Sequence, residues 1–281
     1  MNPRRLCGHF GPCYRSKMFK FLADDSFLFW SVKHFLLLAF LWMSGCSDIE
    51  SNNAEFPESR GDAYAGNSDQ TSEIRVVCSG NFNIKTSEEL LALEGCEEIS
   101  GDLEIHGDDS LLSLDTLSTL QAIGGTLLID ESDTLENIDG LFALTTIGGD
   151  LIISWNDLLI GLNGLYSLER VGGSLSIEGN DALVDVHGLK ALSETNGYIE
   201  VLFNPVLRNV DGLAEIREIS GFLHIGWNDL LDNIDGLSNL QSVIGHILLD
   251  WNASLTTIDG LSGLEFVRGY LKIYNNDALE N

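Results

Sequence analysis

Apolar residues recur along this chain every 24 residues. We number each repeat, or coil, from the glycine that opens it; these glycines are Gly101, Gly125, Gly149, Gly173, Gly197, Gly221, Gly245 and Gly269. Positions three and five of a coil are always Leu, Ile or Val, and positions eleven and seventeen are always Leu. A fixed period in the twenties with strictly placed leucines is typical of a solenoid, in which each coil stacks on the one before.

The alternation inside each coil predicts a strand. Positions one to five alternate small or polar residues with apolar ones, which suits a short strand whose positions three and five face inward. Stacked coils would pair these strands in parallel at about 4.8 Å per coil, giving a rod roughly 35–40 Å long. The predicted fold class is therefore mainly β, a parallel β-solenoid of 24-residue coils.

Position eight is asparagine in six consecutive coils. These residues are Asn156, Asn180, Asn204, Asn228, Asn252 and Asn276. Stacked asparagines can hydrogen-bond one another and the backbone of the bend, so we expect a buried structural ladder.

The amino-terminal part of the chain carries an export signal. Residues 35–43 are a nine-residue apolar run that follows Lys33, which is typical of a secretory signal and too short for a membrane span of about 20 residues. Residues 1–45 are therefore predicted to be a signal segment, for which Met18 is a plausible true start.

Cys46 follows this run directly after Ser44-Gly45. The arrangement resembles the lipobox of bacterial lipoproteins, although Met43 stands where leucine is usual. The resemblance implies cleavage before Cys46, acylation of that cysteine and membrane attachment through the lipid. An uncleaved signal anchor, or an ordinary signal cut nearby, remains the alternative. Residues 46–76 are rich in Ser, Asn, Asp, Glu and Gly, and we expect a flexible tether with a reach of roughly 30 Å.

A cap is predicted at the amino end of the repeats. Thr86 and Glu89 have the spacing of a capping box that opens a short helix, and Cys78 and Cys96 lie on either side of it. In an exported protein this cysteine pair is expected to form a disulfide, whereas two reduced thiols would be expected if export fails.

The residues around this cap resemble a known family. Val77-Cys78-Ser79-Gly80, Leu90-Leu91, Gly95-Cys96, Ile99 and residues 101–105 are similar to the start of a receptor L domain, which occurs in insulin-receptor and epidermal-growth-factor-receptor ectodomains and in bacterial surface proteins. The resemblance covers residues 77–281. It implies a right-handed solenoid related to leucine-rich repeats, with a disulfide-bonded amino-terminal cap. The regular coils favour the bacterial relatives over a growth-factor receptor.

The carboxyl end shows no recognisable cap. The sequence stops at Asn281, within the eighth coil, and we expect a truncated record or an open end rather than a partner that covers this end.

The charge composition limits the classes of partner that this chain is expected to bind. The 281 residues include 15 lysines and arginines against 43 aspartates and glutamates, a formal net charge of −28. Such a charge argues against binding nucleic-acid phosphates or anionic lipid headgroups. The glycines are explained by the 24-residue period, and no cofactor is expected.

Aromatic residues at position seven are the candidate ligand-binding site. Outward residues of the strands contact ligands in L domains, and the match falls on this part of each coil. The candidates are Trp155, Phe203, Trp227 and Trp251, with Leu202, Leu248 and Tyr274 beside them. They could form a platform for a protein segment or for the apolar faces of sugar rings. Alternatively, the rings stack on one another and shield the edge of the strands.

Catalysis and metal binding are not expected. Glu178 and Glu200 lie on neighbouring coils, but only Lys272 supplies a cation at an outward strand position. His224 and His246 are expected to be solvated surface imidazoles, because two histidines without a third ligand make a poor metal site.

A ladder of aspartates at position fifteen is the remaining metal candidate. It consists of Asp211, Asp235 and Asp259, with Asp139 further away. Stacked carboxylates could recruit calcium, but aspartate before glycine more often caps its turn.

The sequence thus predicts a non-enzymatic lipoprotein of the bacterial cell envelope, on the outer membrane or the cell surface, that binds a protein or carbohydrate ligand. A structural envelope spacer and a polysaccharide-active β-helix enzyme are the alternatives.

Overall fold

The computed structural model of the chain describes residues 75–107 and 110–280. The predicted signal segment, Cys46 and most of the predicted tether lie outside the described residues. Within the described part of the chain, no helix is long and apolar enough to cross a bilayer.

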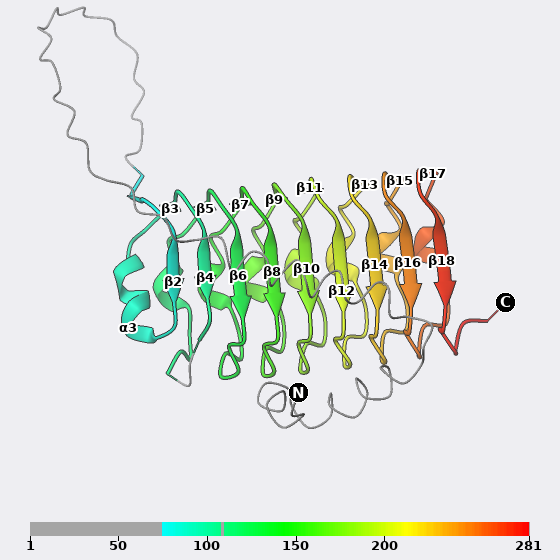
Figure 1. Ribbon diagram of the computed structural model, residues 1–281, viewed down its shortest axis with the longest axis horizontal. Coiled ribbons are helices and arrows are strands. Elements are labelled where there is room, and N and C mark those ends of the chain that lie inside the picture. The colour runs from blue at the N-terminus through cyan, green and yellow to red at the C-terminus, as the bar shows by residue number, and fades with distance from the viewer. Residues whose placement is uncertain (1–74, 108–109, 281) are drawn as a thin grey trace, which may run out of the picture. The chain divides into compact units, whose positions relative to one another are not determined.

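The described residues form a solenoid whose coils each contribute one long strand to a common parallel sheet (Figure 1). Its strands are β2 (Phe82–Ile84), β4 (Leu103–Ile105), β6 (Leu127–Asp130), β8 (Leu151–Ser154), β10 (Leu175–Glu178), β12 (Ile199–Leu202), β14 (Leu223–Gly226), β16 (Ile247–Asp250) and β18 (Leu271–Tyr274). The pairing follows the sequence period, since Leu175 pairs with Ile199 and Leu223 pairs with Ile247. The predicted register of 24 residues is therefore confirmed.

Short strands form a second side of each coil. These are β1 (Val77–Cys78), β3 (Glu98–Ile99), β5 (Ala122–Ile123), β7 (Thr146–Ile147), β9 (Arg170–Val171), β11 (Glu194–Thr195), β13 (Glu218–Ile219), β15 (Ser242–Val243) and β17 (Phe266–Val267). The ladder is continuous from β1 to β11 and again from β13 to β17. Its interruption falls beside Thr195, where the other coils have Ile or Val at position twenty-three.

Single turns of 3-10 helix form the third side, at positions fifteen to seventeen. They are η3 (Asp115–Leu117), η4 (Asp139–Leu141), η5 (Asn163–Leu165), η6 (His187–Leu189), η7 (Asp211–Leu213), η8 (Asp235–Leu237) and η9 (Asp259–Leu261). A glycine stands at the middle of most of these turns because the previous coil lies very close. A Cβ on Gly188, for example, would overlap the Leu162 carbonyl oxygen.

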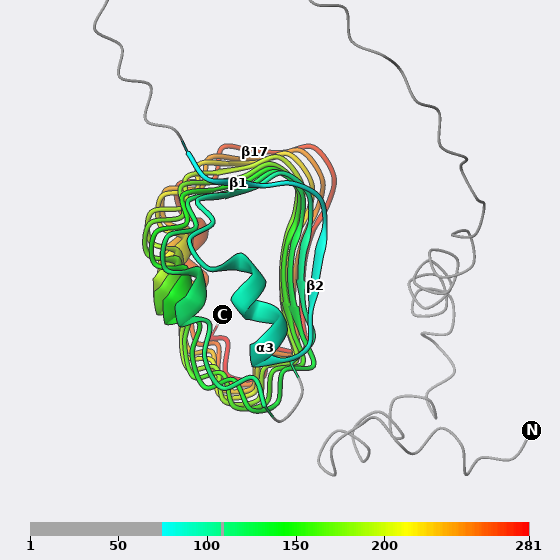
Figure 2. The same ribbon diagram turned by 90° about the vertical axis from the view of Figure 1, so that its left-hand side faces the viewer.

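The leucines of position eleven lie inside the coils. Leu111, Leu135 and Leu159 are all fully buried, as are the inward residues of the long strands from Leu103 to Leu249. Figure 2, which looks along the stack, shows the coil outlines superposed around this core. Residues at the same position of successive coils therefore stack into a column in the structure.

The amino-terminal cap has the predicted form. Helix α3 (Ser87–Leu90) leads into η2 (Leu91–Leu93) at the amino-terminal opening of the coils (Figure 2). The Thr86 hydroxyl accepts from the Glu89 amide, and the Glu89 carboxylate accepts from the Thr86 amide, both at 3.2 Å. A disulfide joins Cys78 to Cys96, whose Cα atoms are 5.9 Å apart.

The asparagines of position eight form a buried column. Asn156, Asn180, Asn204, Asn228 and Asn252 are fully buried, and Asn276 is half-buried. The Asn204 amide group donates to the Ile177 carbonyl at 3.1 Å, and the Asn228 side-chain oxygen accepts from the Asn204 backbone amide at 3.0 Å. Each asparagine thereby satisfies buried backbone groups of two neighbouring coils.

Candidate ligand-binding face

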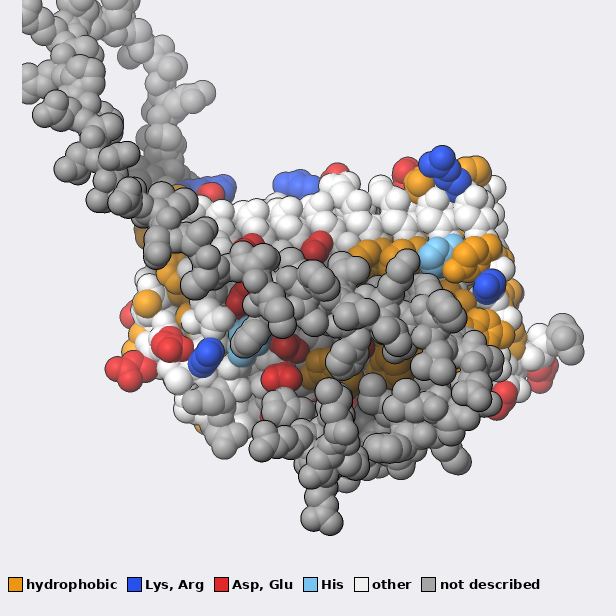
Figure 3. Space-filling view, in the orientation of Figure 1, with side chains coloured by type: hydrophobic (Ala, Val, Ile, Leu, Met, Phe, Trp, Pro, Cys, Tyr) orange, Lys and Arg blue, Asp and Glu red, His pale blue; other side chains and the backbone are white. Residues whose placement is uncertain are grey.

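The outward side of the long strands, with the bend that follows it, is the candidate site. We call it the strand face; it comprises positions two, four, six and seven of each coil. Figure 3 shows hydrophobic side chains gathered over its carboxyl-terminal strands.

The backbone at position seven is left-handed. Trp155, Phe203, Trp227 and Trp251 have φ between 55° and 60°, a conformation that is unfavourable for bulky residues and suits glycine or asparagine. Two coils do use those residues there, Gly179 at φ 70° and Asn275 at φ 56°. The backbone geometry of this bend disfavours aromatic side chains, so it does not explain why they occur there.

Three of these rings form a stack, which we call the bend column: Phe203, Trp227 and Trp251. Ring centroids are 5.3 Å apart for Phe203 and Trp227 and 4.7 Å apart for Trp227 and Trp251, with interplanar angles of 20° and 13°. Trp227 thus has a ring against each of its faces. The fourth aromatic, Trp155, leans over Gly179, where an added Cβ would lie 2.6 Å from the indole.

A second stack, which the sequence analysis did not predict, runs along position two. This strand-start column consists of Tyr198, Phe222, His246 and Tyr270. Successive centroids are 4.7, 5.0 and 4.5 Å apart, and the rings are parallel to within 19°. A signal was present in the sequence, because position two is polar in the first four coils and carries a ring in the last four.

The prediction that His246 is a solvated imidazole is wrong. It lies inside the strand-start column, between Phe222 and Tyr270, and its Nε2 atom is buried without a hydrogen-bond partner. Burial and the nearby charge of His224 lower the pKa of His246, so the ring in the stack is neutral at pH 7.

The prediction that His224 is solvated is also wrong. Its side chain is 8% exposed and lies between two carboxylates, Asp250 on β16 and Glu200 on β12. Its Nε2 is 2.8 Å from Asp250 Oδ1, whereas its Nδ1 is 3.8 Å from Glu200. Burial would lower the pKa of His224, but the hydrogen bond to Asp250 and the Glu200 carboxylate outweigh it and raise that pKa to about 9. His224 is consequently an imidazolium at neutral pH.

Glu178 has the opposite electrostatic environment. It is the last residue of β10, and burial together with the carboxylates of Glu200 and Asp130 raises its pKa to about 7. A carboxyl group with this pKa is about half ionised at neutral pH. The strand face therefore contains one group that can gain or lose a proton under mild conditions.

The remaining predicted contact residues are more enclosed than expected. Leu202 and Leu248 are buried, at 9% and 8% exposed, and Tyr274 is half-buried. Burial and the Asp250 carboxylate raise the pKa of Tyr274 to about 12. The outermost member of the candidate set is Trp251, which is 37% exposed.

The aspartates of position fifteen begin the 3-10 turns. The Asp211 backbone amide donates to Asn209, and that of Asp235 donates to Asn233, at 3.2 and 3.1 Å. Within the described ranges, no three His, Cys, Asp or Glu side chains are placed to hold a metal ion.

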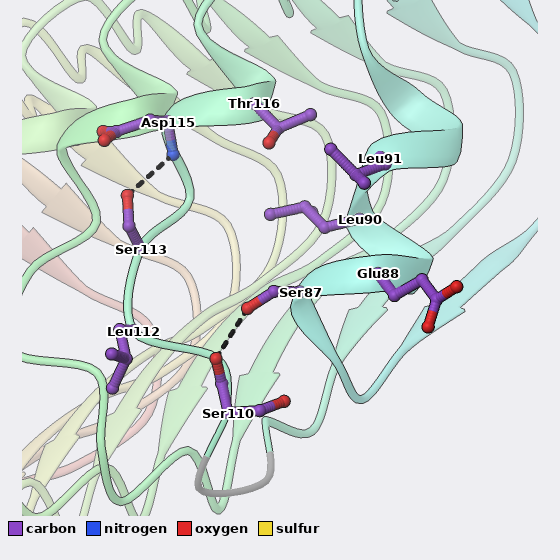
Figure 4. Close-up of a pocket in the computed structure, with 9 residues that line it drawn as sticks. All are labelled: Ser87, Glu88, Leu90, Leu91, Ser110, Leu112, Ser113, Asp115 and Thr116. Atoms are coloured by element: carbon purple, nitrogen blue, oxygen red, sulfur yellow. Dashed lines mark hydrogen bonds between the residues drawn. The ribbon is translucent and has the colours of Figure 1, made fainter.

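A shallow pocket lies between α3 and the segment from Ser110 to Thr116 (Figure 4). The Ser87 hydroxyl donates to the Ser110 carbonyl at 2.6 Å, and exposed Leu91 and Leu112 lie on its walls. These are interactions of a cap with its first coil.

Stacked parallel coils and a disulfide-bonded cap define a β-solenoid. Residues 95–163 match the family model of the Receptor L domain, which confirms the resemblance over that segment. Receptor L domains are non-enzymatic domains that bind ligands. Comparisons with curated proteins and with solved structures gave no match.

Proposed function

We propose that this chain is a non-catalytic lipoprotein of the bacterial cell envelope that uses its strand face to bind a protein or a glycan. The family match to a ligand-binding domain supports a recognition role. The sequence before the solenoid supports export and lipidation at Cys46. Membrane attachment would come from the lipid, and the tether would hold the solenoid away from the bilayer.

The bend column is the observation that carries this proposal. Large rings occupy a left-handed backbone position in coils where glycine or asparagine would cost less. Aromatic residues are also the side chains that most often dominate binding energy at interfaces. A face retained only for folding would not need rings there, since Gly179 and Asn275 complete the same bend.

The test replaces Phe203, Trp227 and Trp251 together by asparagine, the residue that the chain itself uses at φ 56° in Asn275. The control is Phe142→Asn, because Phe142 is an exposed ring (56%) that follows η4, away from the strand face. Capture of envelope proteins and binding to a glycan array should fall at least tenfold in the triple variant and stay unchanged in the control. Equal binding by the triple variant would contradict the proposal.

A structural spacer is the second candidate, and the stacking itself favours it. Trp227 is covered on both faces by its neighbours, and aromatic pairs of this kind contribute about 0.5–1.5 kcal/mol each. The same triple variant separates the two candidates, because a spacer would lose stability without losing any partner.

Lipidation needs its own experiment. Cells that express the full chain are labelled with a palmitate analogue, and wild type is compared with Cys46→Ala. Label should be incorporated in wild type and absent from the variant; equal labelling would rule out acylation of Cys46.

A further inference from the structure

The strand face consists of two halves that differ in charge. In residues 101–196, which we call the acidic half, its positions carry six carboxylates: Asp102, Glu104, Asp130, Glu131, Asp150 and Glu178. In residues 197–280, which we call the aromatic half, two carboxylates are matched by two positive groups: Glu200 and Asp250 against His224 and Lys272. The aromatic half is therefore balanced in charge, although the whole chain carries −28.

The charged groups of the aromatic half contact one another or a ring. His224 Nε2 lies 2.8 Å from Asp250, and its Nδ1 lies 3.8 Å from Glu200. Lys272 Nζ lies 4.6 Å from the centroid of the Tyr270 ring. This half has no excess charge to offer, so electrostatic complementarity favours a partner segment without net charge.

Both aromatic columns begin in the first coil of the aromatic half. Tyr198 is the first ring of the strand-start column and Phe203 is the first ring of the bend column. Figure 3 shows hydrophobic side chains gathered over this end of the strand face. Positions two and seven are about 16 Å apart along a strand, which an extended segment of about five or six residues would span.

The stacking of the rings favours a protein segment over a sugar. Phe222 lies between Tyr198 and His246, with centroids 4.7 and 5.0 Å away, and Trp227 is covered on both faces in the same way. Sugar rings pack against the faces of aromatic rings, which are taken here. The edge of an aromatic ring carries partial positive charge, which attracts carbonyl oxygens. An extended peptide brings backbone carbonyls together with apolar side chains.

We propose that the aromatic half of the strand face binds an extended protein segment that is apolar and carries no net charge, in contact with both aromatic columns. This inference rests on the proposed binding function of the strand face and names the chemistry of its partner. It adds the strand-start column to the binding surface and leaves the acidic half outside it.

The experiment measures binding of the full chain to immobilised decapeptides and to a glycan array at about 0.5 M salt, where exposed charges are screened. In the apolar peptides, serine alternates with leucine or phenylalanine. In the basic and acidic peptides, serine alternates with lysine or with glutamate.

Wild type should bind the apolar peptides at least tenfold more tightly than the basic peptides, the acidic peptides or any glycan. Its affinity for the apolar peptides should change by less than about twofold between 0.15 M and 0.5 M salt, because screening weakens only contacts between charges. Tighter binding of a basic peptide or a glycan, or no binding of the apolar peptides, would overturn the inference.

The strand-start variant replaces Phe222 and His246 by serine, which the chain itself uses at position two in Ser174. The matched control is Phe266→Ser, because Phe266 is an exposed ring (51%) of β17, in a different sheet, and its register partner is already serine. Affinity for the apolar peptides should fall at least tenfold in the strand-start variant and stay unchanged in the control.

Tyr270→Ser is a milder second variant, because it removes only the last ring of the column, which is 44% exposed. It should lower affinity for the apolar peptides about threefold even if the strand-start variant does not fold. Circular dichroism checks the folding of each variant. Unchanged affinity in Tyr270→Ser and in a folded strand-start variant would overturn the inference.

Two further outcomes separate this inference from the proposed function. If the bend-column variant loses its envelope partners while wild type does not bind the apolar peptides, the strand face binds a ligand of another class. Dimers of wild type that the strand-start variant abolishes, measured by light scattering, would make a second copy the occupant and overturn the assignment to a peptide segment.

Discussion

His224 and Asp250 are joined by a 2.8 Å hydrogen bond that runs diagonally between two paired strands. Their register partners are different residues, since His224 pairs with Leu248 and Asp250 pairs with Gly226. The side chains meet because Gly226 has no Cβ: an atom there would lie 2.5 Å from Asp250 Oδ1 and 3.1 Å from His224 Nε2. The backbone at Gly226 does not have a left-handed φ and so does not itself require glycine. Glycine is needed there because a side chain would displace the charge pair.

Gly226→Ala should therefore break this pair. The new methyl group must displace the Asp250 carboxylate from a buried site, and we expect a loss of about 1–3 kcal/mol in the free energy of unfolding. Urea unfolding measures this loss, and NMR titration of His224 should show its pKa falling from about 9 toward its ordinary value. The control is Gly161→Ala, where an added Cβ would meet no atom within 4 Å, so stability should change by less than about 0.5 kcal/mol. Equal effects of the two substitutions would refute the steric argument.

The same pair makes stability depend on alkaline pH. The folded-state pKa of His224, about 9, is above its ordinary value of 6.5, so its contribution is fully present below pH 6.5 and is lost as pH rises through 9. The full loss is about 3–4 kcal/mol, and urea unfolding from pH 6 to pH 10 measures it. Asp250→Asn should show a smaller decline, because one of the two carboxylates that raise this pKa is gone. His187→Gln, at an exposed histidine of η6, should decline as wild type does; an equally steep decline in Asp250→Asn would argue against the pair as the cause.

The asparagine ladder should be intolerant of truncation. In Asn204→Ala, the Ile177 carbonyl loses its 3.1 Å donor and the Asn180 backbone amide loses its 3.1 Å acceptor, both in the interior. Two buried groups without partners should lower the free energy of unfolding by about 3 kcal/mol or more. Asn163→Ala serves as the control, because Asn163 is exposed at the start of η5 and should change stability by less than about 0.5 kcal/mol. A comparable loss in both variants would contradict a special role for the ladder.

The period alone predicted the register, the inward columns and the asparagine ladder. It could do so because every coil repeats the same backbone path, so equal positions such as Asn204 and Asn228 must stack. The cap and its disulfide were predicted from Thr86, Glu89 and the two cysteines, which are local signals in an exported chain.

The electrostatics of the strand face could not be predicted in this way. His224 and Asp250 occupy different positions of the coil, so no column of the repeat brings them together, and their contact depends on the missing side chain of Gly226. The strand-start column could not be predicted for another reason. Position two carries Tyr198 and His246 in late coils but Asp102 and Thr126 in early ones. Because the residue type at this position changes from polar to aromatic along the stack, the position does not stand out as part of the repeat.

Thr195 departs from the repeat, because the other coils have Ile or Val at position twenty-three. Its replacement by valine should stabilise the protein. Thr195 is 3% exposed, and its hydroxyl is buried without a hydrogen-bond partner, whereas Val171 and Ile219 fill the equivalent site in the neighbouring coils at 0% exposed. Thr195→Val keeps the shape and removes the unsatisfied hydroxyl, so the free energy of unfolding should rise by about 1 kcal/mol or more.

The interrupted ladder of short strands offers a second readout of this substitution. If the hydroxyl disturbs the pairing between β11 and β13, amide hydrogen exchange at Glu218 and Ile219 should slow in Thr195→Val. Thr195→Ser is the matched control, because it keeps the hydroxyl and loses the methyl group, and it should be less stable than wild type. A valine variant that is less stable than wild type would mean that the hydroxyl has a partner, such as a buried water, whose loss outweighs the gain.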